Sequence, residues 1–159
     1  MASESARACS AAEAAFRVPY ANARRRRIAL VALDAGAAGL AARLAEQGFP
    51  RAVSLPAEAS GGAWLEALLA PAREVSGLLA EADHLFLLAS AEGDAAMAGA
   101  VADAARERGV PVSAFLVAPA AADDGTLARP LSRLRQVAKM LVVARDEADV
   151  AAVLTALRA

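Results

Sequence analysis

The chain has 159 residues, a length that suits one domain with a hydrophobic core of its own. Its 17 basic and 18 acidic residues leave a formal net charge of −1, and aromatic residues make up only 4%. This balance argues against a protein that binds nucleic acid or an anionic membrane through a strongly basic surface. The single cysteine, Cys9, cannot form an internal disulfide or a Cys/His metal cluster, so we expect a reducing, cytoplasmic location.

Residues 1–27 are predicted to form a flexible tail that ends in the basic run Arg24–Arg27. A basic run followed by the apolar run Ile28–Leu33 is also the pattern of an export signal. Because the apolar run begins far from Met1 and stops at Asp34, we interpret it as a buried first strand. Residues 28–159 are therefore assigned to one domain. No charge-free run of about 18 apolar residues occurs, so we expect no transmembrane segment.

Continuous apolar runs of strand length recur along the chain, and such runs are typical of strands buried on both faces of a parallel sheet. We predict a short second strand at Ala52–Leu55 and four buried central strands. The central strands are Ile28–Leu33, Leu85–Leu88, Val112–Val117 and Met140–Val143.

Segments with helical spacing of apolar residues separate these strands. Gly48 and Gly109 follow two of them at the position of a helix-terminating glycine, and Pro71 should kink or split a third. The predicted helices are Ala37–Gln47, Trp64–Leu79, Ala95–Arg108, Leu131–Lys139 and Asp146–Arg158. Strands that alternate with helices predict an α/β fold, a single three-layer, doubly wound and mostly parallel sheet.

Ligands of open α/β sheets bind beyond the carboxyl ends of the strands, where the strand order switches. The loops after Leu33, Leu88 and Val117 are therefore the places where we expect a site. The first of these loops, Asp34–Gly39, leads into a helix, which is the position of a phosphate-binding glycine loop.

In these segments the chain resembles the nucleotide-binding half of the FtsZ/tubulin family. Ile28–Phe49 is similar to the family's first strand, glycine loop and first helix, and Ala82–Ser90 resembles the strand before its second glycine loop, the tubulin signature. Ala100–Val117 and Leu134–Val143 resemble later segments in the same order. The resemblance implies a Rossmann-like, guanine-nucleotide-binding-type domain linked to cell division or filament regulation. It also implies GTP or GDP as cofactor and an FtsZ-like or other protein partner.

The resemblance places the phosphate loops at Gly36, Ala37, Gly39, Ser90, Gly93 and Ala95. Both loops depart from the family pattern, because alanines replace most of the glycines that allow close backbone approach. Asp34, Glu92 and Asp94 also add negative charge where a phosphate would bind. We therefore expect weak or undetectable GTP binding, and stronger binding once these acids are replaced.

Catalysis is left open by the sequence. In the family the residues that drive hydrolysis come from the second domain of the next subunit, so we expect no appreciable GTP hydrolysis by this chain alone, and we assign no catalytic residue. His84, the single histidine, is interpreted as a packed or surface residue, and Asp123–Gly125 as a turn. No metal site is assigned, because the acids of the loops are expected to form a solvated rim.

Two other functions compete with the family's usual role. One is a degenerate relative that has lost the nucleotide and serves as an interaction or regulatory module. The other is an unrelated flavodoxin-like or Rossmann-like binding domain, which would use the same loops.

Overall fold

The computed structural model describes residues 25–55 and 64–157. The predicted tail up to residue 24, with Cys9, and the predicted break at Ser60–Gly62 lie outside the described residues.

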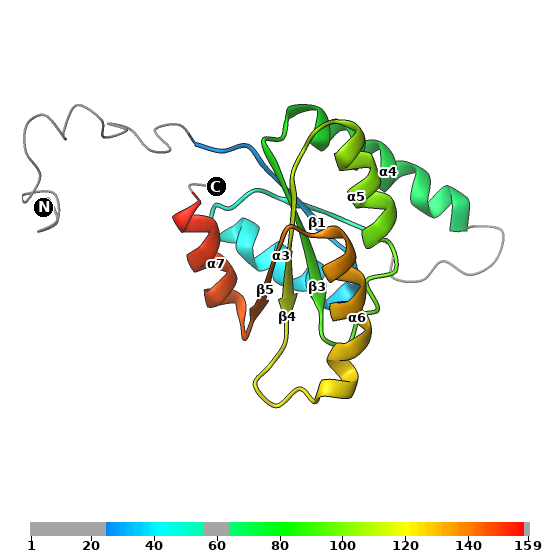
Figure 1. The fold of residues 1–159 in the computed structure, drawn as a ribbon. Coiled ribbons are helices and arrows are strands. Elements are labelled where there is room, and N and C mark those ends of the chain that lie inside the picture. The colour runs from blue at the N-terminus through cyan, green and yellow to red at the C-terminus, as the bar shows by residue number, and fades with distance from the viewer. Residues whose placement is uncertain (1–24, 56–63, 158–159) are drawn as a thin grey trace, which may run out of the picture.

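Five strands alternate with five helices in the described part of the chain (Figure 1). From the N-terminus these elements are β1 (Ile28–Ala32), α3 (Ala35–Glu46), β2 (Ala52–Ser54), α4 (Trp64–Glu81), β3 (His84–Ser90), α5 (Ala98–Glu107), β4 (Val112–Val117), α6 (Asp124–Val137), β5 (Met140–Ala144) and α7 (Glu147–Ala156). None of these helices is both long and apolar enough to cross a membrane.

The strands form one parallel sheet in the order β2-β1-β3-β4-β5. The predicted α/β fold with a parallel sheet is therefore confirmed. This order is the flavodoxin-like variant of the doubly wound, Rossmann-like arrangement. From β1 the chain moves outward to β2 and then returns to the other side as β3, so the strand order switches between β1 and β3.

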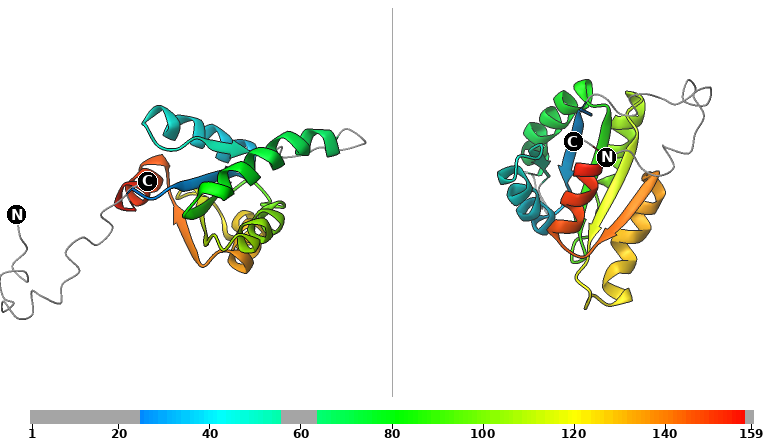
Figure 2. Two further views of the ribbon diagram at one scale, coloured as in Figure 1. Left: turned by 90° about the horizontal axis from the view of Figure 1, so that it is seen from above. Right: turned by 90° about the vertical axis from the view of Figure 1, so that its left-hand side faces the viewer.

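Helices cover both faces of the sheet and make the three layers seen in Figure 2. On one face α3 and α7 pack on side chains such as Leu30, Phe86 and Phe115. The rings of Phe86 and Phe115 are stacked there with centroids 4.8 Å apart. On the other face α4, α5 and α6 pack on Val31, Leu87 and their neighbours. As predicted, β1, β3 and nearly all of β4 are buried.

The prediction that Met140–Val143 is a buried central strand was wrong. β5 lies at one edge of the sheet, and its Met140 and Val143 side chains are 41% and 52% exposed. Central strands and edge strands can both consist of a short apolar run. The sequence pattern alone therefore does not show which of the two positions a strand takes in the sheet.

Three helix predictions also needed correction. α5 begins at Ala98, not at Ala95. α6 begins at Asp124, seven residues before the predicted start, because the Asp123 carboxylate caps it by accepting from the Thr126 N–H at 2.9 Å. α4 runs as one helix through Pro71, so the proline does not split it into two helices.

The two helix-terminating glycines were predicted correctly. Gly48 after α3 has φ +90° and Gly109 after α5 has φ +69°, a left-handed region that glycine enters without steric cost. After α3, the Gly48 N–H donates to Ala45 and the Phe49 N–H donates to Leu44, which is the hydrogen-bond pattern of a Schellman motif.

His84 is packed, as predicted. Its Nε2 lies 2.9 Å from Ser113 Oγ, and its ring centroid lies 4.9 Å from that of Phe86. Burial lowers the pKa of His84 below 6.5, and the positive charges of Arg26 and Lys139 lower it further. The folded protein therefore favours the neutral imidazole.

A histidine with a lowered folded-state pKa binds fewer protons than it does in the unfolded chain, so its contribution to stability is lost as the pH falls below 6.5. We expect the free energy of unfolding of the wild type, measured with urea between about pH 8 and pH 5, to fall more steeply than that of His84→Gln. Parallel pH profiles of the two proteins would contradict this assignment.

Candidate functional site

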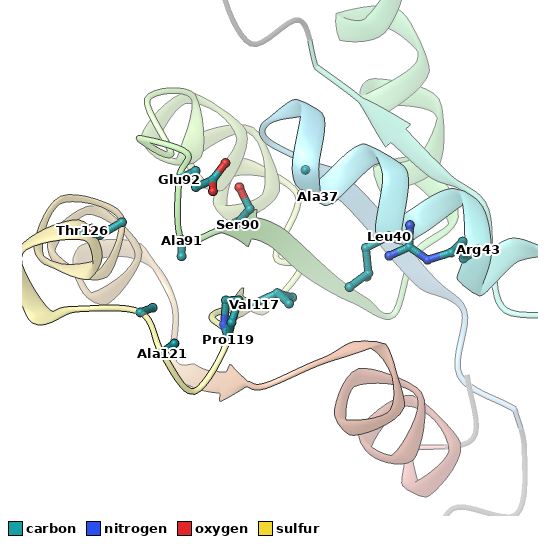
Figure 3. Close-up of a pocket in the computed structure, with 12 residues that line it drawn as sticks. Ala37, Leu40, Arg43, Ser90, Ala91, Glu92, Val117, Pro119, Ala121 and Thr126 are labelled. Atoms are coloured by element: carbon teal, nitrogen blue, oxygen red, sulfur yellow. The ribbon is translucent and has the colours of Figure 1, made fainter.

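A pocket of ≈ 450 Å³ opens beyond the carboxyl ends of the central strands (Figure 3). Its walls come from the first turns of α3, the end of β3 with the following loop, the loop after β4, and the start of α6. Because α3 follows β1, the pocket lies at the switch between β1 and β3. This is where ligands of such sheets bind, and where the sequence placed the site.

The pocket wall is mostly apolar. Seven of its twelve residues carry only hydrocarbon side chains, and these are Ala37, Leu40, Ala91, Val117, Pro119, Ala121 and Ala122. Polar groups come from Arg43, Ser90, Glu92 and Thr126. The Thr126 hydroxyl already donates to the Asp123 carboxylate at 2.8 Å. The wall thus offers a hydrocarbon surface with few polar contacts, which is the usual chemistry of a small-molecule site.

Asp34 is a buried acid whose carboxylate links two pocket residues, Ala37 and Ser90, and we call it the clamp. It is 7% exposed and lies just before α3. Its Oδ1 accepts from the Ala37 N–H at 2.9 Å, which caps α3, and its Oδ2 accepts from the Ser90 N–H at 2.9 Å. One carboxylate thereby joins the start of α3 to the end of β3. Asp34 was predicted to place charge beside a phosphate, but it is not part of the pocket wall.

Two glycines fit closely around this clamp. A Cβ on Gly93 would lie 2.2 Å from Asp34 Oδ2. A Cβ on Gly36 would lie 2.8 Å from Ser90 Oγ and 3.3 Å from Asp34 Oδ1. The contacts at 2.2 Å and 2.8 Å are shorter than those of real Cβ atoms, so both positions need glycine for close packing. A Gly36→Val substitution would therefore disturb the fold as well as any ligand.

The three acids of the loops do not converge. Asp94 pairs with Arg133, with Oδ2 3.3 Å from the guanidinium, and also accepts from the Ala96 N–H. Glu92 is exposed, lines the pocket and has no hydrogen-bond or ion-pair partner among the described residues. No group of His, Cys, Asp or Glu in the described ranges is arranged to hold a metal ion.

Of the six residues predicted for the phosphate loops, Gly36, Ala37 and Ser90 line the pocket. The other three do not, and these are Gly39, Gly93 and Ala95. The Gly39 carbonyl accepts from Arg43, and Gly93 packs on Asp34. Ala95 is buried with φ +52°, and α5 begins three residues after it, so no helix N-terminus starts there.

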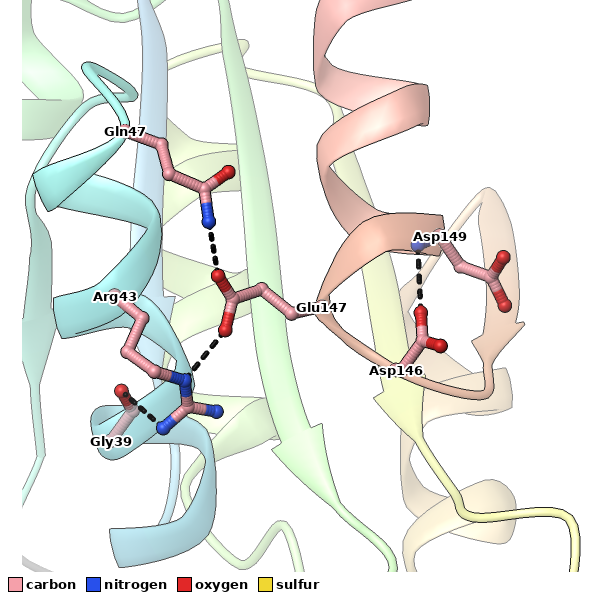
Figure 4. Close-up of polar contacts among 6 residues, drawn as sticks. All are labelled: Gly39, Arg43, Gln47, Asp146, Glu147 and Asp149. Atoms are coloured by element: carbon pink, nitrogen blue, oxygen red, sulfur yellow. Dashed lines mark hydrogen bonds and ion pairs between the residues drawn. The ribbon is translucent and has the colours of Figure 1, made fainter.

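Arg43 on α3 also lines the pocket and was not predicted from the sequence. Figure 4 shows the contacts that hold it. Its Nε donates to Glu147 Oε2 at 2.5 Å, and a terminal nitrogen donates to the Gly39 carbonyl at 3.1 Å. Gln47 donates to the other oxygen of Glu147. Glu147 is 104 residues from Arg43 along the chain, so no local pattern could reveal this pairing.

The charges around the pocket do not favour an anion. Glu147 balances the charge of Arg43, whereas Glu92 faces the pocket with no balancing cation in the described part of the chain. A negative group placed about 4 Å from Glu92 would meet a repulsion of about 1–4 kcal/mol, depending on the local dielectric.

Comparison of the sequence with models of protein families found no match, and a search of curated proteins found no relative either. The resemblance to the FtsZ/tubulin family stays a prediction.

We expect Gly93→Ala to lower the free energy of unfolding by about 2–4 kcal/mol, because the new methyl group must displace the Asp34 carboxylate or the loop. Gly77→Ala is the matched control, since it lies inside α4 and a Cβ there meets nothing within 4 Å. That control should be neutral or stabilise by up to about 1 kcal/mol. Urea unfolding of both variants provides the measurement, and equal effects would rule out the close contact.

Asp34→Asn tests the clamp itself. The two N–H groups of Ala37 and Ser90 point at different oxygens, and in the carboxamide an NH2 donor replaces one of these oxygens, so we expect a loss of about 1–3 kcal/mol. Asp146→Asn is the control, because Asp146 caps α7 through one oxygen only, by accepting from the Asp149 N–H. It should cost less than about 0.5 kcal/mol. A clamp variant as stable as this control would refute the role of Asp34.

Proposed function

We propose that this chain is a binding module whose pocket at the β1/β3 switch takes an uncharged, mainly apolar group, and that it does not hydrolyse GTP alone. Such a module is the interaction or regulatory module that does not bind nucleotide. The observation that carries it is the place of Asp34, which occupies the N-terminus of α3 where a phosphate would bind.

Two acidic side chains, Asp34 and Glu92, oppose a phosphate at this pocket. Phosphate sites at helix N-termini use free N–H groups and the positive end of the helix dipole. In α3 the Asp34 carboxylate takes the Ala37 N–H and sets its own negative charge against that end of the dipole. In addition, Glu92 lines the pocket without a balancing cation among the described residues. Both acids therefore oppose a bound phosphate.

The pocket wall supports an uncharged occupant. Hydrocarbon side chains supply most of the surface, and burying apolar area is worth about 25 cal/mol per Å². The Ser90 hydroxyl can add one directional hydrogen bond. A small ring system or an apolar side chain of a partner protein would meet these groups without placing a negative charge beside Glu92.

A second candidate function is guanine-nucleotide binding of the FtsZ/tubulin type, in cell division or filament regulation. The position of the pocket favours it, because nucleotides bind at the same switch point in doubly wound sheets. It is also supported by the four segments that resemble the family, because they occur in the same order along the chain. In that case the base and ribose would use the apolar wall, and the phosphates would have to tolerate Glu92.

Titration calorimetry with guanosine and with GTP plus Mg²⁺ separates the two candidates, because the two ligands share base and ribose and differ in the phosphates. We expect a dissociation constant for GTP above about 1 mM, with no phosphate release. Guanosine should bind at least as tightly as GTP. A GTP dissociation constant below about 10 µM, or sustained turnover of about 1 per second, would contradict the proposal.

Two variants test the pocket directly. Glu92→Gln should strengthen any GTP binding without changing guanosine binding, whereas Glu107→Gln, outside the pocket wall, should change neither. Ala121→Trp should fill the pocket and remove binding of either ligand. Ala120→Trp is its control, because Ala120 is exposed next to Ala121 and does not line the pocket.

A further inference from the structure

Arg43 is the one cationic side chain on the pocket wall among the described residues, and it is held from two sides (Figure 4). Its Nε donates to Glu147 on α7 at 2.5 Å, and one terminal nitrogen donates to the Gly39 carbonyl of its own helix at 3.1 Å. The other terminal nitrogen has no hydrogen-bond partner in the described part of the chain. Arg43 therefore keeps one nitrogen that can donate to a ligand.

Glu147 contacts two residues of α3 that lie one helical turn apart. Its Oε2 accepts from Arg43, and its Oε1 accepts from Gln47. The Glu147 side chain is only 22% exposed, and its helix is packed on the sheet through the buried Val150 and Leu154. The carboxylate therefore belongs to an element that is anchored in the core, and both of its oxygens are used to hold α3. This arrangement fixes the orientation of the Arg43 guanidinium.

These contacts disfavour the usual way in which an arginine binds an anion. A guanidinium binds a carboxylate or phosphate best through two parallel N–H groups, either from Nε and a terminal nitrogen or from both terminal nitrogens. In Arg43 each of these pairs includes a nitrogen that already donates within the protein. Glu147 also balances the positive charge, which weakens the attraction for an anion. Arg43 thus offers a ligand one hydrogen bond rather than a bidentate anion site.

We propose that the pocket takes a neutral carbonyl compound with an apolar body, that Arg43 donates to its carbonyl oxygen, and that Glu147 is the positioning residue that makes the site select against anions. This inference rests on the proposed function, because it names the class of the uncharged ligand. A guanidinium carries only donors, so the ligand atom that meets it must be an acceptor, as a carbonyl oxygen is. Figure 3 shows the guanidinium of Arg43 beside Leu40, so the apolar body of the ligand would lie along the hydrocarbon wall.

Benzamide and benzoate are matched probes for this inference, because they share the ring and the carbonyl group and only benzoate is charged. Titrations of the full chain, followed by NMR, give the affinity from the backbone amides of the pocket and the contact from the Nε–H signal of Arg43. For the wild type we expect benzamide to bind more than about fivefold more tightly than benzoate. Benzamide should also shift the Arg43 Nε–H signal, since its carbonyl oxygen meets the same guanidinium.

Three variants separate the roles of the two residues. Glu147→Gln removes the balancing charge and keeps the side-chain length, so the ratio of benzoate affinity to benzamide affinity should rise at least about fivefold. Arg43→Gln should weaken benzamide binding at least about threefold, because the donor to the carbonyl oxygen is lost. Glu107→Gln is the matched control, since it removes the same charge from an exposed residue at the end of α5, near the start of β4 and outside the pocket wall. Its affinities should equal those of the wild type, and circular dichroism verifies that all three variants are folded.

The results that would overturn this inference differ from those that would overturn the proposed function. An affinity ratio that Glu147→Gln leaves unchanged, or that Glu107→Gln raises equally, refutes the role of Glu147 while the neutral pocket stands. Benzamide binding that Arg43→Gln leaves unchanged refutes the contact with the carbonyl oxygen in the same way. If neither benzamide nor guanosine binds to the wild type at concentrations up to about 10 mM, the proposed function fails, and this inference fails with it.

Discussion

The hydrogen bonds of the Asp34 carboxylate are the constraint on which the site depends. In a doubly wound sheet the chain leaves β1 and β3 towards opposite sides of the sheet. A crevice therefore opens between the loops that follow these two strands. Asp34 spans this gap, with one oxygen on the Ala37 N–H at the start of α3 and the other on the N–H of Ser90, which is 56 positions from Asp34 in sequence. Gly93 and Gly36 are both needed beside it, because any larger side chain would push the two elements apart.

The same carboxylate occupies a group that a phosphate site at this position would use. The free N–H groups and positive dipole that begin a helix are available to a ligand only if the protein does not use them itself. Here the protein uses the Ala37 N–H internally and adds a fixed negative charge. One residue therefore joins two elements beside the crevice and also places its carboxylate at the start of α3, next to a pocket wall made mainly of hydrocarbon.

The sequence predicted most of the sheet, because β1, β3 and β4 are continuous apolar runs that are buried on both faces. The loops that it named for a phosphate site also border the pocket, where Gly36, Ala37 and Ser90 line the wall. The sequence could not distinguish β5 from a central strand, because edge position is a property of the assembled sheet. It read Asp34 as a surface acid, since only the structure shows that the Ser90 N–H reaches it. Contacts between distant segments, such as Arg43 with Glu147, leave no local pattern at all.

Ala95 shows how such a fold restricts later sequence change. Its φ of +52° costs an L-amino acid about 1–2 kcal/mol, yet its methyl group is buried in the core beside α5. Elsewhere in the core, removal of a methyl group opens a void and is unfavourable. At Ala95, removal of the methyl group would relieve the unfavourable backbone conformation. A branched side chain would be disfavoured by this conformation and would also have to fit into the packed core. The two tendencies oppose each other, so glycine is the natural substitute here and valine or isoleucine, otherwise ideal for a buried site, is the worst.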